Sequence, residues 1–160
     1  MSIKKVKKDY FERLNTKNYN NFDFFSNKQP LNTSNFPQHF FAIAALFAKD
    51  CNYHISNFDT QNGILSISGH YKGKGNELML RFRNNRSLVV ARIKFINQRK
   101  GYMTELFKIL EKVRRRYELK SIIIESVHSD SMENWCKKNK FNASSINPAN
   151  YEKKFKTGNT

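Results

Sequence analysis

Cysteine, proline and glycine are scarce in this 160-residue chain, which has two, three and six of them respectively. The two cysteines, Cys51 and Cys136, make neither a disulfide framework nor a metal cluster, and we expect no metal site. No apolar run approaches the roughly 18 residues that cross a membrane, and the N-terminus lacks the apolar core of a secretion signal. These absences predict a reduced cytoplasmic protein.

Acidic residues are also few, because 13 of them face 29 basic ones and leave a net charge of +16 at pH 7. The excess is densest in residues 91–120, which hold ten basic and three acidic side chains. Such a charge predicts an acidic or polyanionic partner without saying which one, and nucleic acid (tRNA or DNA) is one such partner. Oligomeric state is not fixed by the sequence, and a dimer remains open.

The length fits one domain with a basic extension. Residues 1–30 are interpreted as an N-terminal arm whose amphipathic segment, residues 4–15, forms a helix packed on the body. A basic arm on nucleic acid is the alternative, but lysine runs are usually solvated faces. Residues 31–160 are expected to form the single domain.

Apolar periodicity outlines this domain. The segment from Pro37 to Asp50 is apolar nearly all round and predicts a buried helix. Short turn-forming sets separate four predicted strands, which implies antiparallel neighbours in a meander. These strands span residues 53–58, 64–71, 77–82 and 88–96.

Residues 87–141 are the stretch around which the chain is organised. A strand, a polar turn, an amphipathic helix over residues 102–117, and the short strand Ser121–Ile124 form a βαβ unit with parallel strands. A second helix over residues 130–139 follows, and residues 151–155 predict a final edge strand. The expected fold is therefore α+β (α/β) with a mixed sheet.

The turn of the βαβ unit is the best candidate site. Gly101 lets a ligand come close to the backbone, because it has no Cβ atom. The unpaired amides and positive end of the following helix favour an anion, above all phosphate. Arg99 and Lys100 add positive charge beside it.

The residues of this turn resemble the GNAT N-acetyltransferase superfamily, whose loop pattern is [QR]-x-x-G-x-[GA]. The matching segment is Gln98-Arg99-Lys100-Gly101-Tyr102-Met103, in which Met103 departs from the usual small residue. The later family pattern, L-Y-x-K-x-G-F, corresponds to residues 135–141, where Lys138 and Phe141 match. Cys136 stands in place of the tyrosine that often protonates the departing thiolate, and Lys140 replaces the glycine.

The resemblance covers the second half of the chain and implies a GNAT-like sheet with helices on both faces. It further implies acetyl-CoA as the cofactor, with the backbone of Phe95 and Ile96 along the pantetheine arm. The diphosphate would lie on the loop and the start of the helix, which comprise Gln98, Arg99, Lys100, Gly101, Tyr102, Met103 and Thr104.

Three side chains are candidates for acid–base chemistry, each with a structural alternative. Glu125 follows the buried strand as a potential base, although a hydrogen bond to a nearby backbone amide would explain it equally well. His128 lies near the parallel strands, but a lone loop histidine is more often a surface residue. Cys136 belongs to an apolar stripe and fits a buried structural cysteine better than an acid or nucleophile.

Two functions remain open on this basis. The first is an N-acetyltransferase that acts on an amine carried by a polyanion such as aminoacyl-tRNA. The second is a GNAT-like protein without transfer activity that binds DNA or RNA through its basic surface. The missing tyrosine favours the second function, and the complete Gln98–Glu105 loop favours the first.

Overall fold

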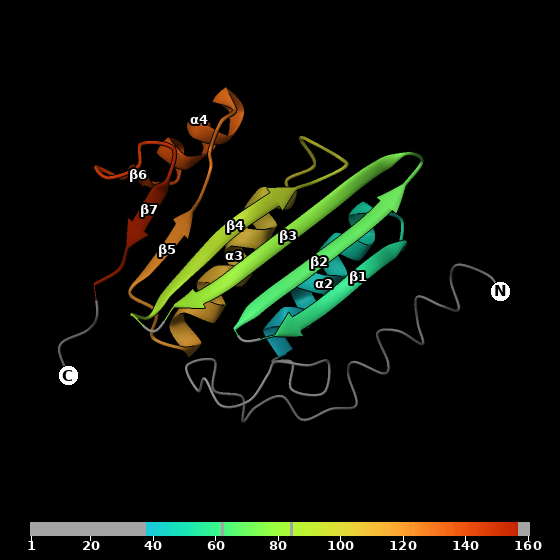
Figure 1. The fold of residues 1–160 in the computed structure, drawn as a ribbon, viewed down its shortest axis with the longest axis horizontal. Helices are drawn as coiled ribbons and strands as arrows, with labels where there is room; N and C mark the ends of the chain where they lie inside the picture. The colour runs from blue at the N-terminus through green and yellow to red at the C-terminus, as the bar shows by residue number, and fades with distance from the viewer. Residues whose placement is uncertain (1–37, 62, 84, 157–160) are drawn as a thin grey trace.

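The computed structural model describes residues 38–61, 63–83 and 85–156, and the arm expected at residues 1–30 lies outside them. The described residues form one mixed seven-stranded sheet and three helices, an α+β fold (Figure 1). The strand order is β1-β2-β3-β4-β5-β7-β6. The helices are α2 (Gln38–Asp50), α3 (Tyr102–Arg116) and α4 (Asp130–Lys138). The strands are β1 (Ile55–Gln61), β2 (Ile64–Tyr71), β3 (Lys74–Arg83), β4 (Ser87–Lys94), β5 (Ser121–Ile124), β6 (Asn142–Ala143) and β7 (Tyr151–Lys154).

The first four strands form the predicted antiparallel meander. The β2–β3 ladder continues to the pair Tyr71↔Lys74, so β3 begins earlier than the sequence pattern predicts. Lys72 and Gly73 both have positive φ, at 49° and 73°, as a tight two-residue hairpin turn requires. This Lys-Gly segment is therefore a hairpin tip.

The predicted βαβ unit is confirmed. β4 and β5, which precede and follow α3 in the chain, pair with each other in parallel. Their pairing runs only from Ser87↔Ser121 to Val90↔Ile124. The next residue of β4, Ala91, is an extra residue relative to β3, since Leu80 pairs with Val90 but Met79 pairs with Arg92. Such a bulge bends its strand, and Figure 1 shows β4 and β5 diverging towards α4.

The prediction of a final edge strand is wrong. β7 lies between β5 and β6, with Ile124 paired to Tyr151 on one side and Ala143 on the other. The two-residue strand β6 occupies the edge instead. A strand this short leaves no periodic pattern in the sequence, so only the folded pairing identifies the edge.

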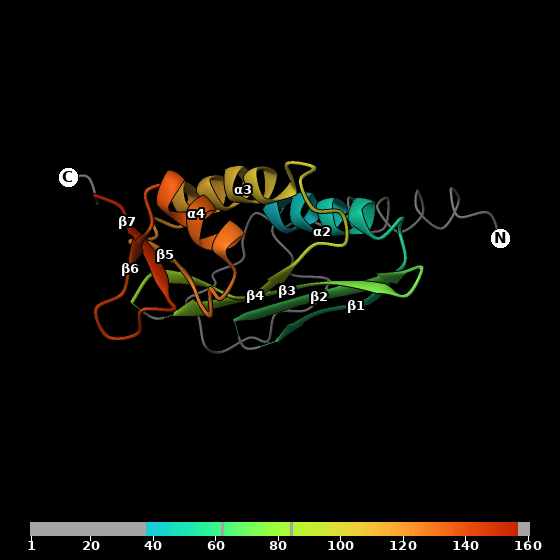
Figure 2. The ribbon, with the colours of Figure 1, turned by 90° about the horizontal axis from the view of Figure 1, so that it is seen from above.

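All three described helices cover the same face of the sheet (Figure 2). This differs from the expected helices on both faces, since the part of the chain that the structure describes has helices on one face only. Alternate residues of the central strands and the apolar stripe of α3 meet on that face and form the core. Its fully buried side chains include Ile43, Phe47, Leu65, Ile67, Leu78, Leu80, Leu88, Val90, Leu106, Leu110 and Val113.

None of the three described helices is both long enough and apolar enough to pass through a bilayer.

Candidate anion-binding site at the start of α3

A cavity of about 470 Å³ lies at the end of β4, between the first turn of α3 and the start of α4. Its size lies in the range of small-molecule sites. Residues from the end of β4, the following turn, the first turn of α3 and the start of α4 form its walls. They are Ile93, Lys94, Phe95, Asn97, Gln98, Arg99, Gly101, Tyr102, Met103, Thr104, Ser129, Ser131, Met132 and Trp135.

The N-terminus of α3 faces this cavity without a side-chain cap. Gly101 is the N-cap residue with φ 76°, and its carbonyl accepts the Glu105 amide at 3.0 Å. The amides of the first helical turn have no partner within the helix itself. A Cβ atom at Gly101 would meet nothing within 4 Å outside the adjacent residues, so there is open space beside the backbone at this point. Open amides and the positive helix end together attract an anion.

The turn before α3 is held by Asp50, the last residue of α2. One carboxylate oxygen accepts the Ile96 amide at 2.8 Å, and the other accepts the Asn97 amide at 2.9 Å. The Asn97 side chain donates to the same carboxylate and to the Asp50 carbonyl, at 3.1 and 2.8 Å. Asn76 completes the set at 2.9 Å. The buried carboxylate thus fixes where β4 ends and how the chain approaches α3.

Sequence reasoning missed Asp50, although one signal was available. Acidic side chains are disfavoured at the C-terminal end of a helix, where the dipole is negative. An aspartate at that position therefore indicates a compensating set of donors elsewhere in the fold. Because the Ile96 amide donates its hydrogen bond to this carboxylate, it is not available for strand pairing. β4 therefore ends at Lys94, before the predicted end at residue 96.

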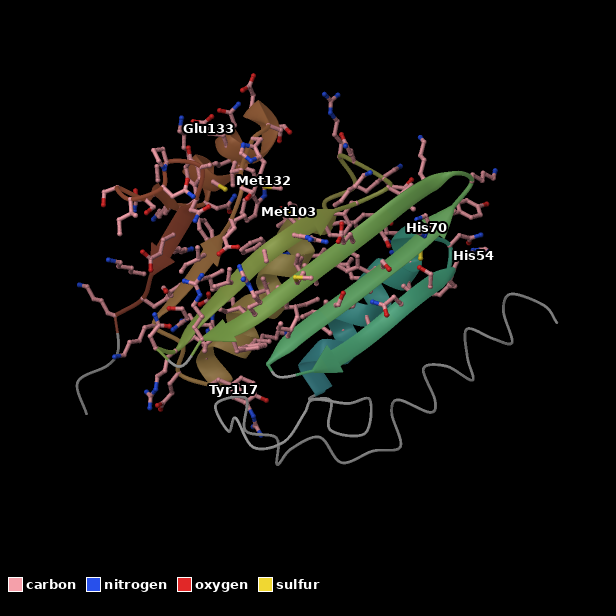
Figure 3. The ribbon with its side chains drawn as sticks, viewed as in Figure 1. His54, His70, Met103, Tyr117, Met132 and Glu133 are labelled. Atoms are coloured by element: carbon pink, nitrogen blue, oxygen red, sulfur yellow. The ribbon has the colours of Figure 1, made fainter. Side chains whose placement is uncertain are left out.

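Aromatic contacts support both ends of the turn. The Phe95 ring stacks on Phe47 of α2, with centroids 4.7 Å apart, and meets the Tyr102 ring at 5.5 Å. On the other wall, Trp135 of α4 packs against Phe107 of α3 at 4.5 Å. Met103 and Met132, which Figure 3 labels on α3 and α4, add apolar surface to the cavity. The cavity therefore combines an apolar wall with an anion-attracting helix terminus.

Seven of the nine residues expected at the cofactor line this cavity, and the exceptions are Ile96 and Lys100. The Ile96 amide is already bound to Asp50 and cannot donate to a ligand. Arg99 lines the cavity, and its backbone is left-handed, with φ 61°.

Glu125 lies where the two strands separate, since its amide donates to the Val90 carbonyl at 3.0 Å. Its carboxylate is paired with Arg81, and with Arg83 at 3.1 Å, rather than with a backbone amide. Both arginines alternate with Leu80, so they belong to the sheet face opposite α3. Glu125 does not line the cavity, and its role as a base stays a prediction.

Cys136 is fully buried in the core and does not line the cavity. Burial, and secondarily the charge of Glu133, raises the pKa of its thiol to about 11. Glu133 is itself bound by Lys137 at 2.6 Å and by the Tyr151 hydroxyl at 3.0 Å. His128 is an exposed loop residue outside the cavity walls. Neither Cys136 nor His128 therefore joins the cavity that holds the predicted cofactor residues.

The end of α4 has a glycine-like conformation at Lys140, whose φ is 65°. The Phe141 amide donates to the Cys136 carbonyl at 2.9 Å across this residue, as in a left-handed helix C-cap. Glycine usually occupies such a position because it lacks a Cβ atom. The backbone at residue 140 is thus the one that a glycine would favour.

Sequence reasoning also missed the α4 wall of the cavity, which Ser129, Ser131 and Trp135 contribute. The amphipathic pattern predicts that α4 exists but not which edge of α3 it contacts.

A scan against protein-family models and a search of curated proteins both find no match to this chain.

Proposed function

We propose that this chain binds acetyl-CoA as a GNAT-like protein and transfers the acetyl group to an amine. One observation carries the proposal: the cavity between the end of β4, α3 and α4 opens onto the uncapped N-terminus of α3 at Gly101. The loop resemblance and this geometry concern the same residues, although they are independent observations. The antiparallel meander that leads into the βαβ unit agrees with the arrangement that the resemblance implies.

The residues present fit such a cofactor. Its diphosphate suits the open amides of the first turn of α3 and the cation of Arg99. The less polar pantetheine arm suits the apolar side chains of Met103, Met132 and Trp135. Beyond Val90 the edge of β4 that faces β5 has no strand partner among the described residues, which leaves backbone groups for the arm.

When bound, acetyl-CoA supplies an acetyl group activated as a thioester. The chain's own contribution is to position a neutral amine and to stabilise charge in the transition state. A backbone amide on the free edge of β4 is the proposed oxyanion donor. Glu125, at the point of strand separation, is the proposed acceptor of the amine proton, directly or through water.

Thr104 offers the sharpest binding test, because it is exposed in the first turn of α3 and lines the cavity. Thr104→Glu adds a carboxylate that suits the helix dipole yet repels a diphosphate. We expect acetyl-CoA affinity, measured by calorimetry, to fall roughly tenfold to a hundredfold, or about 1.4–2.8 kcal/mol. Thr104→Gln is the matched neutral control and should remain within about threefold of the wild type. Gly101→Glu is a poorer test, since φ 76° strains any side chain there.

If the wild type does not bind acetyl-CoA, the proposal is wrong. If Thr104→Glu and Thr104→Gln lose affinity equally, the diphosphate does not lie at the start of α3. Thermal unfolding of each variant shows whether the fold is retained.

The acceptor is proposed to be an amine carried by a polyanion, such as aminoacyl-tRNA, because a chain of charge +16 repels cationic polyamines. Transfer of labelled acetyl groups to aminoacyl-tRNA, free amino acids and spermidine tests this class directly. Glu125→Gln should lower the transfer rate without weakening acetyl-CoA binding.

A second candidate, a nucleic-acid-binding protein without transfer activity, draws support from Cys136. This residue stands where the family often has its acid, and its thiol is enclosed with a raised pKa. Acetyl-CoA binding without transfer to any of the three amines would favour this candidate.

A further inference from the structure

A second hollow, of about 550 Å³, runs along the outer side of α3 towards α4 and β7. We call it the aromatic groove, after the four rings in its walls: Phe107, Trp135, Phe141 and Phe155. We propose that the aromatic groove binds single-stranded nucleic acid, with bases against these rings and phosphates on the surrounding cations. This inference does not depend on acetyl-CoA binding.

Three of the rings, Phe107, Trp135 and Phe141, form one cluster, whereas Phe155 stands apart from them and has Arg114 4.2 Å from its ring centroid. Phe107 contacts Trp135 with centroids 4.5 Å apart and meets Phe141 edge-on at 5.4 Å. Phe141 is almost fully buried and forms the floor, whereas Phe107, Trp135 and Phe155 are partly exposed. Bases stack on such side chains irrespective of their identity, because every base presents a π-face.

The cations of the groove supply the complementary charge. Lys108, Lys112, Arg115 and Lys153 line it, with Glu111 as the one carboxylate in its walls. Glu111 is bound by Arg114 at 2.7 Å and lies 3.6 Å from Arg115, so its charge is compensated. Lys108, Lys112 and Lys153 form no salt bridge within the part of the chain that the structure describes.

A single strand fits this arrangement better than a duplex does. In a duplex the bases are stacked on one another and only their edges are reached through the grooves. Rings within a hollow contact bases that are already unstacked, while lysines along the rim follow the backbone. The groove therefore selects an unpaired segment and reads its charge rather than its sequence.

The test is fluorescence anisotropy with labelled ten-nucleotide oligo-U, oligo-dT and a duplex of equal length. The double variant Lys108→Glu/Lys112→Glu should weaken single-strand binding at least tenfold. It should also reduce the slope of log affinity against log salt by about 1.4, as expected for two lost phosphate contacts. Lys72→Glu/Lys74→Glu is the matched control, since it changes the charge equally at the β2–β3 turn, far from β7 (Figure 1). The control should retain affinity within about threefold.

Two aromatic readouts distinguish the groove from a purely ionic surface. Trp135 is the only tryptophan of the chain and lines both the aromatic groove and the cofactor cavity. Its intrinsic fluorescence should be quenched when unlabelled oligo-U binds, and Phe155, which lines the groove but not the cavity, assigns this binding to the groove. Phe155→Leu should weaken binding roughly fivefold or more and leave the salt slope unchanged.

The proposal is overturned by absent binding, by equal affinity for duplex and single strand, or by equal losses in both double variants. It is also overturned if acetyl-CoA displaces the oligonucleotide, because both ligands then occupy the cofactor cavity. Acetyl-CoA binding is measured on the same variants, and we expect Lys108→Glu/Lys112→Glu to retain it. Oligonucleotide binding thus tests the groove, and acetyl-CoA binding tests the cofactor cavity, so either proposal can fail without the other.

Discussion

Asp50 provides the deepest test of the site, because its carboxylate joins α2 to the turn before α3. We predict that Asp50→Asn destabilises the fold and weakens acetyl-CoA binding together. Each carboxylate oxygen accepts two hydrogen bonds: Ile96 and Asn76 donate to one, and Asn97 donates twice to the other. In asparagine an amide nitrogen replaces one oxygen, so two of these four donors then face another donor.

The magnitude follows from these contacts. A buried donor without an acceptor costs about 1–3 kcal/mol, and two such donors cost about 2–6 kcal/mol. Asp50 itself is only 1% exposed. Water can reach the Asn97 side chain, which is more exposed, so we expect the lower part of this range, about 2–4 kcal/mol. That is a large share of the roughly 5–15 kcal/mol that stabilises a typical domain.

Urea unfolding followed by circular dichroism measures the effect. With a slope of about 2 kcal/mol per molar urea, the middle of the usual range, the midpoint should fall by about 1–2 M. Asp130→Asn is the control, since Asp130 is exposed in the first turn of α4, and it should cost less than about 1 kcal/mol. An Asp50→Asn midpoint equal to that of the wild type would refute the role of this carboxylate as an anchor. Unchanged acetyl-CoA affinity in a destabilised Asp50→Asn would refute only its link to the site.

Three further predictions concern the fold. Lys140→Gly should raise the free energy of unfolding by about 0.5–1 kcal/mol in urea titrations, because φ 65° favours glycine; a loss of stability would contradict this. Burial raises the pKa of the Cys136 thiol from 9.0 to about 11, so the unfolded chain ionises first. Stability should therefore be complete below about pH 9 and should fall towards pH 11 by up to about 2–3 kcal/mol more than in Cys136→Ala; equal pH profiles would contradict this. Leu110→Ala should lower the free energy of unfolding by about 2–5 kcal/mol, since this side chain is fully buried against the sheet.

Periodicity in the sequence predicted the elements that pack by one regular face. β2 and β5 have the predicted bounds, and α3 begins at the predicted Tyr102. The turn at Gly101 was identified because glycine before an amphipathic helix has a local physical meaning. Such features depend on neighbours in the chain, so one sequence is enough to recognise them.

Features that depend on distant partners could not be predicted in this way. The position of β7 between β5 and β6 results from pairing across the sheet, which no local pattern encodes. For Glu125 the sequence suggested a base or, equally well, a hydrogen bond to a nearby backbone amide, but its carboxylate is bound by Arg81 and Arg83, over 40 residues away. The Asp50 anchor is of the same kind, since its carboxylate bonds residues 46 and 47 positions further along.

The basic side chains of the described residues fall into two groups, those bound to carboxylates within the fold and those that form no salt bridge. Several arginines are bound to carboxylates, among them Arg83 with Glu125 and Arg92 with Glu77. Arg114, near the end of α3, binds Glu111 and covers the Phe155 ring at 4.2 Å, which makes it part of the fold rather than a contact for a partner. The uncompensated lysines of the aromatic groove instead lie on the outer side of α3.

In the two proposals, α3 attracts anions in two physically different ways. At its N-terminus the proposed attraction comes from fixed backbone amides, and we expect it to be only moderately sensitive to salt. Along its outer side it comes from mobile lysines such as Lys108 and Lys112, whose effect is screened within about 10 Å at 0.1 M salt. Raising the salt concentration should therefore weaken oligonucleotide binding far more steeply than acetyl-CoA binding. Parallel salt dependences would mean that both ligands use the same cations, and the separation of the two sites would then be wrong.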